Sequence, residues 1–344
     1  MTAVAVAGIG IAYPGNLDQD EVWHGFFARH YDGLRPGLAR RIFANSGVTR
    51  RHGVVNPLAE DVSAWSTEAR MRRYLTEALP LGKDAVSSAL DAAGLAPADV
   101  GLFVVCSCTG YVTPGLDILL ARDLGMAPGT QRLFIGHMGC YAALPGLSAA
   151  TDYVTARGKP AVLLCIELTS LHVQPATRDA QQIVAHALFS DAAAAVVFLP
   201  DATGGPVVQE VAAVTDTATA DHMTWDVTDL GFRMGLSAKV PGVLSLYVAD
   251  LVRDLLARHD RTLADVVGWA VHPGGPKILD VVRDELGLPE AALSPSRRTL
   301  AEHGNCSSPT VLLILDALLR RGARGTMVML AFGPGLTLYG ALLT

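Results

Sequence analysis

The segment DAVSSALDAAGLAPADVGLFVVC, residues 84–106, recurs in altered form 166 residues later as DLVRDLLARHDRTLADVVGWAV, residues 250–271. Asp84 and Asp250 begin the two copies. In each copy, apolar residues at helical spacing are followed by an apolar run rich in β-branched residues. Each copy therefore predicts a helix, a short turn and a buried strand.

A second pair of segments follows the same offset. The identical residues are His137, Cys140, Leu147 and Val162 in the first copy, and His303, Cys306, Leu313 and Val328 in the second. The closing strands are predicted over 160–165 and 326–332. Alternating helices and buried strands predict sheets that are covered on both faces, in two similar halves. The alternative is a chance alignment of two ordinary α/β segments.

Composition excludes several classes of protein. Half of the 344 residues are apolar and only 17% are charged, which rules out intrinsic disorder. The net charge is −6 and there is no long basic run, so nucleic acid is not the expected partner. Length alone predicts about two packed units.

The cysteines and two uncharged stretches bear on location. Five cysteines without a Cys-x-x-Cys pair or zinc-type spacing predict a reduced, cytoplasmic protein without a metal site. Residues 1–10 predict a buried strand and not a signal peptide. The uncharged stretches 133–151 and 326–344 contain Pro and Gly. They therefore predict a buried helix or a strand–turn–strand unit and no membrane span.

Cys140 is the first candidate for chemistry, because α/β proteins carry functional groups on loops that follow strands or open helices. It lies in FIGHMGCYAAL, residues 134–144, before a helix predicted to run to about Arg157. At a helix N-terminus, free N–H groups and the macrodipole favour a thiolate, so we expect a lowered pKa. The alternative is an inert cysteine of the core.

Two further candidates follow in the second half. His272 ends a predicted apolar strand and precedes the rigid turn PGGP, which leaves its imidazole at the strand tip. Asn305 lies in HGNCSSP, residues 303–309, ahead of a helix predicted over 310–321. A structural histidine and a helix N-cap are the respective alternatives. Together with Cys140, the two would supply a nucleophile, an acid/base partner and an oxyanion donor for acyl transfer through a thioester.

Five segments of the chain together resemble the thiolase superfamily and, within it, the type III polyketide synthases, which are the chalcone-synthase-like enzymes. The segments are GCYAA (139–143), ALFSDAAAA (187–195), AVHPGGPKIL (270–279), HGNCSS (303–308) and FGPGLT (332–337). The resemblance implies an α/β protein with the duplicated, five-layered αβαβα thiolase-like fold. It implies a nucleophile-bearing half over 1–200 and a half over 201–344 that carries the histidine and the asparagine.

The resemblance also implies the reaction. An acyl starter bound to Cys140 is extended iteratively by decarboxylative condensation with malonyl-CoA and then cyclised to a pyrone, a resorcinol or a related phenol. His272 activates Cys140, and His272 with Asn305 holds the thioester oxygen of malonyl-CoA. No cofactor or metal is implied, because CoA thioesters are the substrates. The partners implied are malonyl-CoA, an acyl-CoA or carrier-protein starter, and a second copy in a homodimer.

The resemblance further implies a set of substrate-binding residues: Phe189 and Phe232 as gates, Cys108 and His172 in the cavity wall, Arg41 at the CoA phosphates, and Gly274 and Ser307. This chain departs from the plant pattern at two of these residues and at a third position near Arg41. Cys108 and His172 stand where plant enzymes have Thr, and Asn45 replaces a lysine near Arg41. Starter, chain length and ring type therefore stay open.

Three alternative functions stay open at this point. A β-ketoacyl-carrier-protein synthase III would share the cysteine, histidine and asparagine but catalyse a single condensation. A cysteine hydrolase would use the same chain order of residues, although its Cys-Gly-Ser-Cys-Trp type of signature is absent. A non-catalytic subunit of the same fold is the third.

Overall fold

The computed structural model describes residues 3–201 and 204–344. Two mixed sheets form its frame. The first has the strand order β1 (Val4–Ala12), β7 (Ala192–Pro200), β6 (Ala161–Glu167), β4 (Leu102–Cys106) and β5 (Gln131–Ile135). The second has the order β11 (Gly268–Val271), β12 (Met327–Gly333), β13 (Thr337–Leu343) and β8 (Val208–Thr215). β4 pairs in parallel with β5 and β6, and β11 pairs in parallel with β12, while β1, β7, β13 and β8 pair antiparallel.

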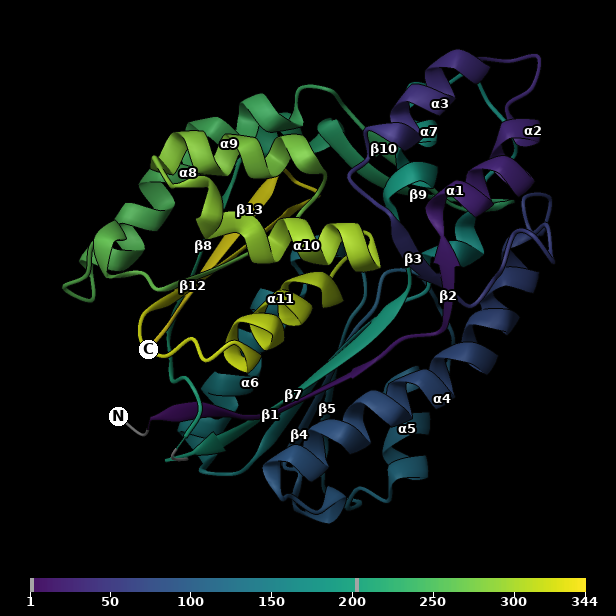
Figure 1. Ribbon diagram of the computed structural model, residues 1–344. Helices are drawn as coiled ribbons and strands as arrows, with labels where there is room; N and C mark the ends of the chain where they lie inside the picture. The colour runs from purple at the N-terminus through teal and green to yellow at the C-terminus, as the bar shows by residue number, and fades with distance from the viewer. Residues whose placement is uncertain (1–2, 202–203) are drawn as a thin grey trace.

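Helices cover both faces of each sheet (Figure 1). The outer layers are α4 (Thr67–Ala93) with α5 (Leu116–Leu124), and α8 (Val240–Ala257) with α9 (Pro276–Leu286). Between the sheets lie α6 (Ala143–Arg157) and α11 (Pro309–Arg320), which share one apolar core with both of them. This arrangement confirms the predicted five-layered αβαβα fold.

The sequence of β4 is an unbroken apolar run because both of its faces are buried. Phe103 and Val105 pack with α4 and α5 in the outer core, whereas Val104 and Cys106 pack with α6 in the central core. Successive side chains of a strand point to opposite faces. Because both faces are covered, each position has to be apolar.

The repeat is confirmed at the level of secondary structure. β6 covers 161–167 and β12 covers 327–333, which is a shift of 166 residues. α6 begins at Ala143 and α11 at Pro309, with the same shift. The two copies are therefore equivalent parts of one duplicated frame.

The second uncharged stretch forms a buried strand–turn–strand unit, as predicted, and the first is mostly buried from Cys140 onward, whereas its Leu133 and Phe134 are exposed. Residues 326–344 fold into the antiparallel pair β12 and β13. Residues 133–151 contain the end of β5, the 3₁₀ turn Gly139–Tyr141 and the start of α6. Within residues 3–201 and 204–344, no helix is long and apolar enough to cross a membrane. The predicted N-terminal strand is β1; Met1 and Thr2 lie outside the described residues.

The remaining elements gather mostly at one end of the layers, in the upper right of Figure 1. The helices among them are α1 (Gln19–Val22), α2 (Ala28–His30), α3 (Pro36–Ala44), α7 (Ala180–Leu188) and α10 (Ser294–His303). The strands are β2 (Gly15–Asp18), β3 (Arg50–Gly53), β9 (Met223–Thr228) and β10 (Gly231–Leu236). Several of these elements line the candidate site, together with the N-terminal ends of α8 and α9.

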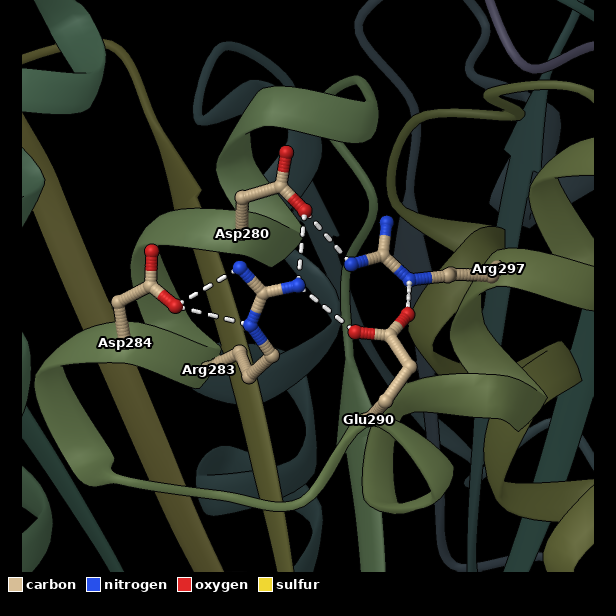
Figure 2. Close-up of polar contacts among 5 residues, drawn as sticks. All are labelled: Asp280, Arg283, Asp284, Glu290 and Arg297. Carbon is tan, nitrogen blue, oxygen red and sulfur yellow. Dashed lines mark hydrogen bonds and ion pairs between the residues drawn. The ribbon is translucent and has the colours of Figure 1, made fainter.

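A cluster of five charged side chains fastens α9 to α10 (Figure 2). Arg283 on α9 pairs with Glu290, at 2.7 Å, and Arg297 on α10 pairs with the same carboxylate at 2.7 Å. Asp280 and Asp284 complete the cluster through further contacts to these arginines. α9 follows the loop of His272, and α10 precedes the loop of Asn305. The cluster therefore links the two helices that hold the loops of these candidate residues.

Candidate active site

One cavity of about 640 Å³ brings Cys140, His272 and Asn305 together. Cys140 opens α6, His272 directly follows β11, and Asn305 lies in the loop between α10 and α11. All three are at most 7% exposed. The fold therefore unites the three candidates that lie up to 165 residues apart in the sequence. We call this space the main cavity.

Cys140 lies in the 3₁₀ turn Gly139–Tyr141, which leads into α6 as the sequence predicts. Gly139 adopts a φ of +72°, and a Cβ there would lie 3.1 Å from Pro334, so glycine suits this position. Burial raises the pKa of the Cys140 thiol to about 11, and the nearby Ser307 hydroxyl only partly offsets this. The expectation of a lowered pKa is therefore wrong for the free protein, because burial between the two halves outweighs the helix start.

His272 is buried with both ring nitrogens free of partners among residues 3–201 and 204–344. Its backbone N–H donates to the Leu330 carbonyl oxygen at 2.8 Å, which fixes the strand tip. Burial lowers the pKa of His272 to about 3, so the ring is neutral near pH 7. A neutral imidazole with free nitrogens can take a proton from a thiol and can donate its own N–H to a substrate.

Asn305 is fixed by its own loop. Its Oδ1 accepts from the Ser307 N–H at 2.8 Å, so the amide NH₂ is the group that remains for a ligand in the cavity. Ser308, and not Asn305, occupies the N-cap position of α11, which excludes the N-cap alternative. The Asn305 backbone pairs with the chain at Phe189: its N–H donates to Leu188 O at 2.9 Å, and its carbonyl accepts from Ser190 N at 2.9 Å.

α7 separates the main cavity from a second, smaller one of about 50 Å³, which we call the inner cavity. The residues of α7 that line the main cavity include Gln181, Val184 and Leu188. Those that line the inner cavity include Gln182 and Ala185. Residues three and four apart share one side of a helix, so the two sets mark two sides of α7. Phe189, directly after the helix, lines both cavities, which is where a gate between them would stand.

Phe232 and His172 both line the inner cavity. Their rings stack with centroids 4.6 Å apart, and Trp225 meets His172 edge-on at 5.5 Å. Both His172 nitrogens are used, by Thr109 O at 2.7 Å and by the Phe232 N–H at 3.0 Å. Burial lowers the His172 pKa to about 3. These aromatic side chains account for the small volume of the inner cavity.

Phe232 does not line the main cavity beside Phe189. Met234, two residues further along β10, lines it instead. Phe232 and Met234 lie on the same face of β10, because strand positions two apart point to the same face. The residue that lines the main cavity is therefore the next one along that face. Because the segment differs in length from the plant pattern, sequence matching could not distinguish Phe232 from Met234.

Cys108 and Ser307 lie next to Cys140 around a buried carboxyl group that the sequence analysis missed. Glu167, at the end of β6, accepts from the Cys108 N–H at 3.0 Å, the Thr109 hydroxyl at 2.8 Å and the Ser308 hydroxyl at 3.1 Å. Burial raises the pKa of Glu167 to about 7 despite these donors. A glutamate that ends an otherwise apolar strand, in LLCIE, is the signal that could have identified it.

At the other end of the main cavity, Gly274 lines the wall, as do Asn45 and Lys277. Arg41 is exposed on α3 and is not among the lining residues. Lys277 therefore brings a cation to the side of the cavity where Asn45 is neutral. Its place directly after the PGGP turn is the sequence signal for it. Among the described residues, no group of three or more His, Cys, Asp or Glu could hold a metal ion.

Two family models match the chain. The model for the N-terminal domain of chalcone and stilbene synthases matches residues 39–202, and that for the C-terminal domain matches residues 208–344. Together they span most of the sequence.

Curated relatives agree with these matches. The chain is 38% identical over 321 residues to a 1,3,6,8-tetrahydroxynaphthalene synthase of Streptomyces peucetius subsp. caesius, covering 88% of this chain and 83% of the relative. It is 32% identical over 328 residues to the alpha-pyrone synthesis polyketide synthase-like Pks18 of Mycobacterium tuberculosis, covering 90% of this chain and 83% of the relative.

Solved structures show the same likeness in three dimensions. The 1,3,6,8-tetrahydroxynaphthalene synthase of Streptomyces coelicolor A3(2) superposes with a TM-score of 0.91 at 29% identity, covering 98% of each chain. The PKS-I of the brown alga Ectocarpus siliculosus superposes with a TM-score of 0.93 at 29% identity, covering 100% of this chain and 98% of that one. These matches favour the type III reading over the synthase III alternative. The chain belongs to the chalcone and stilbene synthase family, and it is a type III polyketide synthase, an acyltransferase that uses CoA thioesters and needs no cofactor.

Proposed function

We propose that Cys140 carries the acyl chain through repeated condensations with malonyl units, with His272 and Asn305 acting on the thioester oxygen. The observation that carries this proposal is the convergence of the three side chains on one buried cavity. A thiol, a neutral imidazole and a free amide NH₂ are the groups that acyl transfer and enolate formation need.

Loading begins when the Cys140 thiol gives its proton to neutral His272. The thiolate attacks the carbonyl carbon of the starter thioester, and the sulfur–carbon bond to CoA breaks. The imidazolium returns the proton to the departing CoA thiolate. Burial raises the pKa of Cys140 and lowers that of His272, so the free protein holds a protonated thiol and a neutral imidazole. The thiolate–imidazolium pair forms only as the thioester approaches.

Extension follows in the same cavity. Malonyl-CoA loses CO₂, and the electron pair of the broken bond forms an enolate with negative charge on the thioester oxygen. Hydrogen bonds from His272 and the Asn305 amide stabilise that charge by roughly 3 kcal/mol each. The enolate carbon attacks the carbonyl carbon of the Cys140 thioester, so the new carbon–carbon bond forms, the bond to the Cys140 sulfur breaks and the extended chain is left on CoA. For the next cycle, the Cys140 thiolate takes the chain back from CoA by the same step as in loading.

The other residues take supporting roles in the proposal. Phe189 acts as the gate between the cavities, Arg41 and Gly274 contact CoA, and Cys108, His172, Phe232 and Ser307 shape the space for the growing chain. The relatives' names, a tetrahydroxynaphthalene synthase and an α-pyrone synthase-like protein, support a cyclised product such as a pyrone, a resorcinol or a related phenol. The starter arrives on CoA or on a carrier protein.

The proposal includes a homodimer in the cytoplasm. β5 is the edge strand of the first sheet, and its Leu133 and Phe134 are 39% and 38% exposed. An exposed apolar edge strand favours association with a second copy. A division into a nucleophile half, 1–200, and a half carrying His272 and Asn305, 201–344, also belongs to the proposal. The boundary between the two matched family models supports it.

The test is product analysis of the full chain with a panel of acyl-CoA starters and isotopically labelled malonyl-CoA. Mass spectrometry should find cyclised products that contain several malonyl-derived units. A single β-ketoacyl product from each starter would instead support the single-condensation alternative. Sedimentation analysis of the same protein should give the mass of a dimer, and a monomer at working concentration would contradict that part.

A further inference from the structure

Gln182 is a buried polar side chain that the proposed reaction does not use. It lies on the inner-cavity side of α7, is 3% exposed, and its Oε1 has no partner within the described part of the chain. An amide oxygen that is buried without a hydrogen bond destabilises the fold. Such a group is retained where a ligand supplies the missing partner.

Arg51, on β3, also lines the inner cavity and carries a second unpartnered group. Its terminal nitrogens donate to carbonyl oxygens at the C-terminal end of α7: His186 at 2.7 Å, Ala187 at 2.6 Å and Phe189 at 3.1 Å. The Nε–H is left without a partner among residues 3–201 and 204–344. Burial lowers the Arg51 pKa to about 10, so the side chain is still charged near pH 7.

Three residues that line the inner cavity carry an unpartnered polar atom among the described residues: Arg51, Gln182 and His52, the last at Nδ1. The free groups of Arg51 and Gln182 have opposite hydrogen-bonding character. Arg51 Nε–H is a donor, and Gln182 Oε1 is an acceptor. A ligand that fits both must carry an acceptor and a donor close together, because the inner cavity measures only about 50 Å³. A β-dicarbonyl unit in its enol form has this pattern, with a keto oxygen next to an enol hydroxyl group. It is also the unit that each condensation adds to the chain.

We propose that Arg51 and Gln182 form a binding site for the enolised β-dicarbonyl unit of the growing chain, on the far side of Phe189 from Cys140. Arg51 Nε–H donates to the keto oxygen, and the enol hydroxyl group donates to Gln182 Oε1. The site holds the chain after it has passed the gate and so favours further extension over early release. This inference rests on the proposed function.

The decisive variant is Gln182→Met, which keeps the length of the side chain and removes its polar atoms. Gln209→Met makes the same change at an exposed position of strand β8 and serves as the control. We expect Gln182→Met to leave the acylation of Cys140 and the decarboxylation of malonyl-CoA near wild type. The ratio of longer to shortest products should fall by about tenfold, which corresponds to one lost hydrogen bond in a buried site.

Thermal unfolding is the second readout, and it does not depend on activity. Because Gln182→Met removes an unpaired buried oxygen, its Tm should equal or exceed that of the wild type. A wild-type product ratio in Gln182→Met would overturn the proposal. A clear fall in Tm would do the same, because it would show that the amide is already satisfied in the free protein. Failure of Cys140 acylation in the wild type would instead remove the proposed function itself.

Discussion

The loops at 137–147 and 303–313 occupy equivalent places in the two halves but differ in chemistry. Cys140 lines the main cavity, whereas its counterpart Cys306 is fully buried, and its thiol donates to the His303 carbonyl oxygen at 3.4 Å. Gly139 corresponds to Asn305, so only the second loop carries the amide. The duplicated frame thus supplies equivalent backbone positions, and the candidate active site combines residues that only one of the halves carries.

Replacing each of the two matched cysteines by alanine, one at a time, is the strongest test of this asymmetry. Cys140→Ala should abolish covalent acylation, because the nucleophile is lost, and intact-protein mass spectrometry after incubation with acyl-CoA should detect no adduct. Cys306→Ala should still form the adduct and should lose only about 1 kcal/mol of unfolding free energy in urea. Acylation that persisted in Cys140→Ala would mean that another thiol carries the chain.

Asn305→Asp tests the difference at the second matched position. The carboxylate retains the acceptor for the Ser307 N–H but has no hydrogens to donate to the enolate oxygen. We expect the release of labelled CO₂ from malonyl-CoA to slow by about 10²- to 10³-fold. Loading of the starter should be affected less, since Cys140 and His272 are intact. An unchanged rate of decarboxylation would exclude the amide as the donor.

The pH dependence of alkylation compares the two thiols in one experiment. Burial raises the pKa of Cys140 to about 11 and that of Cys306 to about 12, so both keep their protons beyond the range of an ordinary cysteine. The rate of Cys140 alkylation by iodoacetamide should rise about tenfold per pH unit between roughly pH 7 and 9, because only the thiolate reacts. Cys306, which lies outside the cavity, should not react until the protein unfolds. A plateau for Cys140 below pH 8 would instead reveal a preformed thiolate–imidazolium pair.

The charged cluster of Figure 2 gives the smallest expected effect. Arg283→Ala removes contacts to Asp284 and Glu290 and weakens the link between α9 and α10. Because the cluster is exposed to solvent, the loss of unfolding free energy should be small. It should shrink further in roughly 1 M salt. A larger loss, or reduced activity of the folded variant, would show that the supports of His272 and Asn305 depend on this link.

Features carried by short stretches of sequence could be predicted. The repeat, β6 and β12, and the positions of Cys140, His272 and Asn305 follow from apolar patterns and from glycine-rich turns that bound them. Each of these signals lies within a few residues of the feature that it predicts. The layout in two similar α/β halves and the three candidate residues therefore needed no knowledge of long-range packing, whereas the five-layered fold was implied by the resemblance to a known family.

Features that depend on packing between distant elements could not be predicted. The pKa of Cys140 is raised by its burial between the two halves. The position of Cys140 near a helix start had predicted a lowered pKa. Met234 takes the place expected for Phe232 because the register of β10 is set by its pairing with β9. Gln182 and Gln181 are neighbours in the sequence, and only the three-dimensional fold shows that they face different cavities.

The backbone pairing between Phe189 and Asn305 has a consequence for how such an enzyme can change over evolutionary time. The proposed gate, Phe189, and the proposed enolate donor, Asn305, are joined by hydrogen bonds of the main chain, which substitutions other than proline leave in place. We therefore expect a mutation that shifts α7 to displace the Asn305 amide as well. We therefore expect new products to arise most readily from substitutions of side chains in the cavity walls, such as Trp225, His172 and Met234. These side chains can change in size without moving the backbone pairing between Phe189 and Asn305.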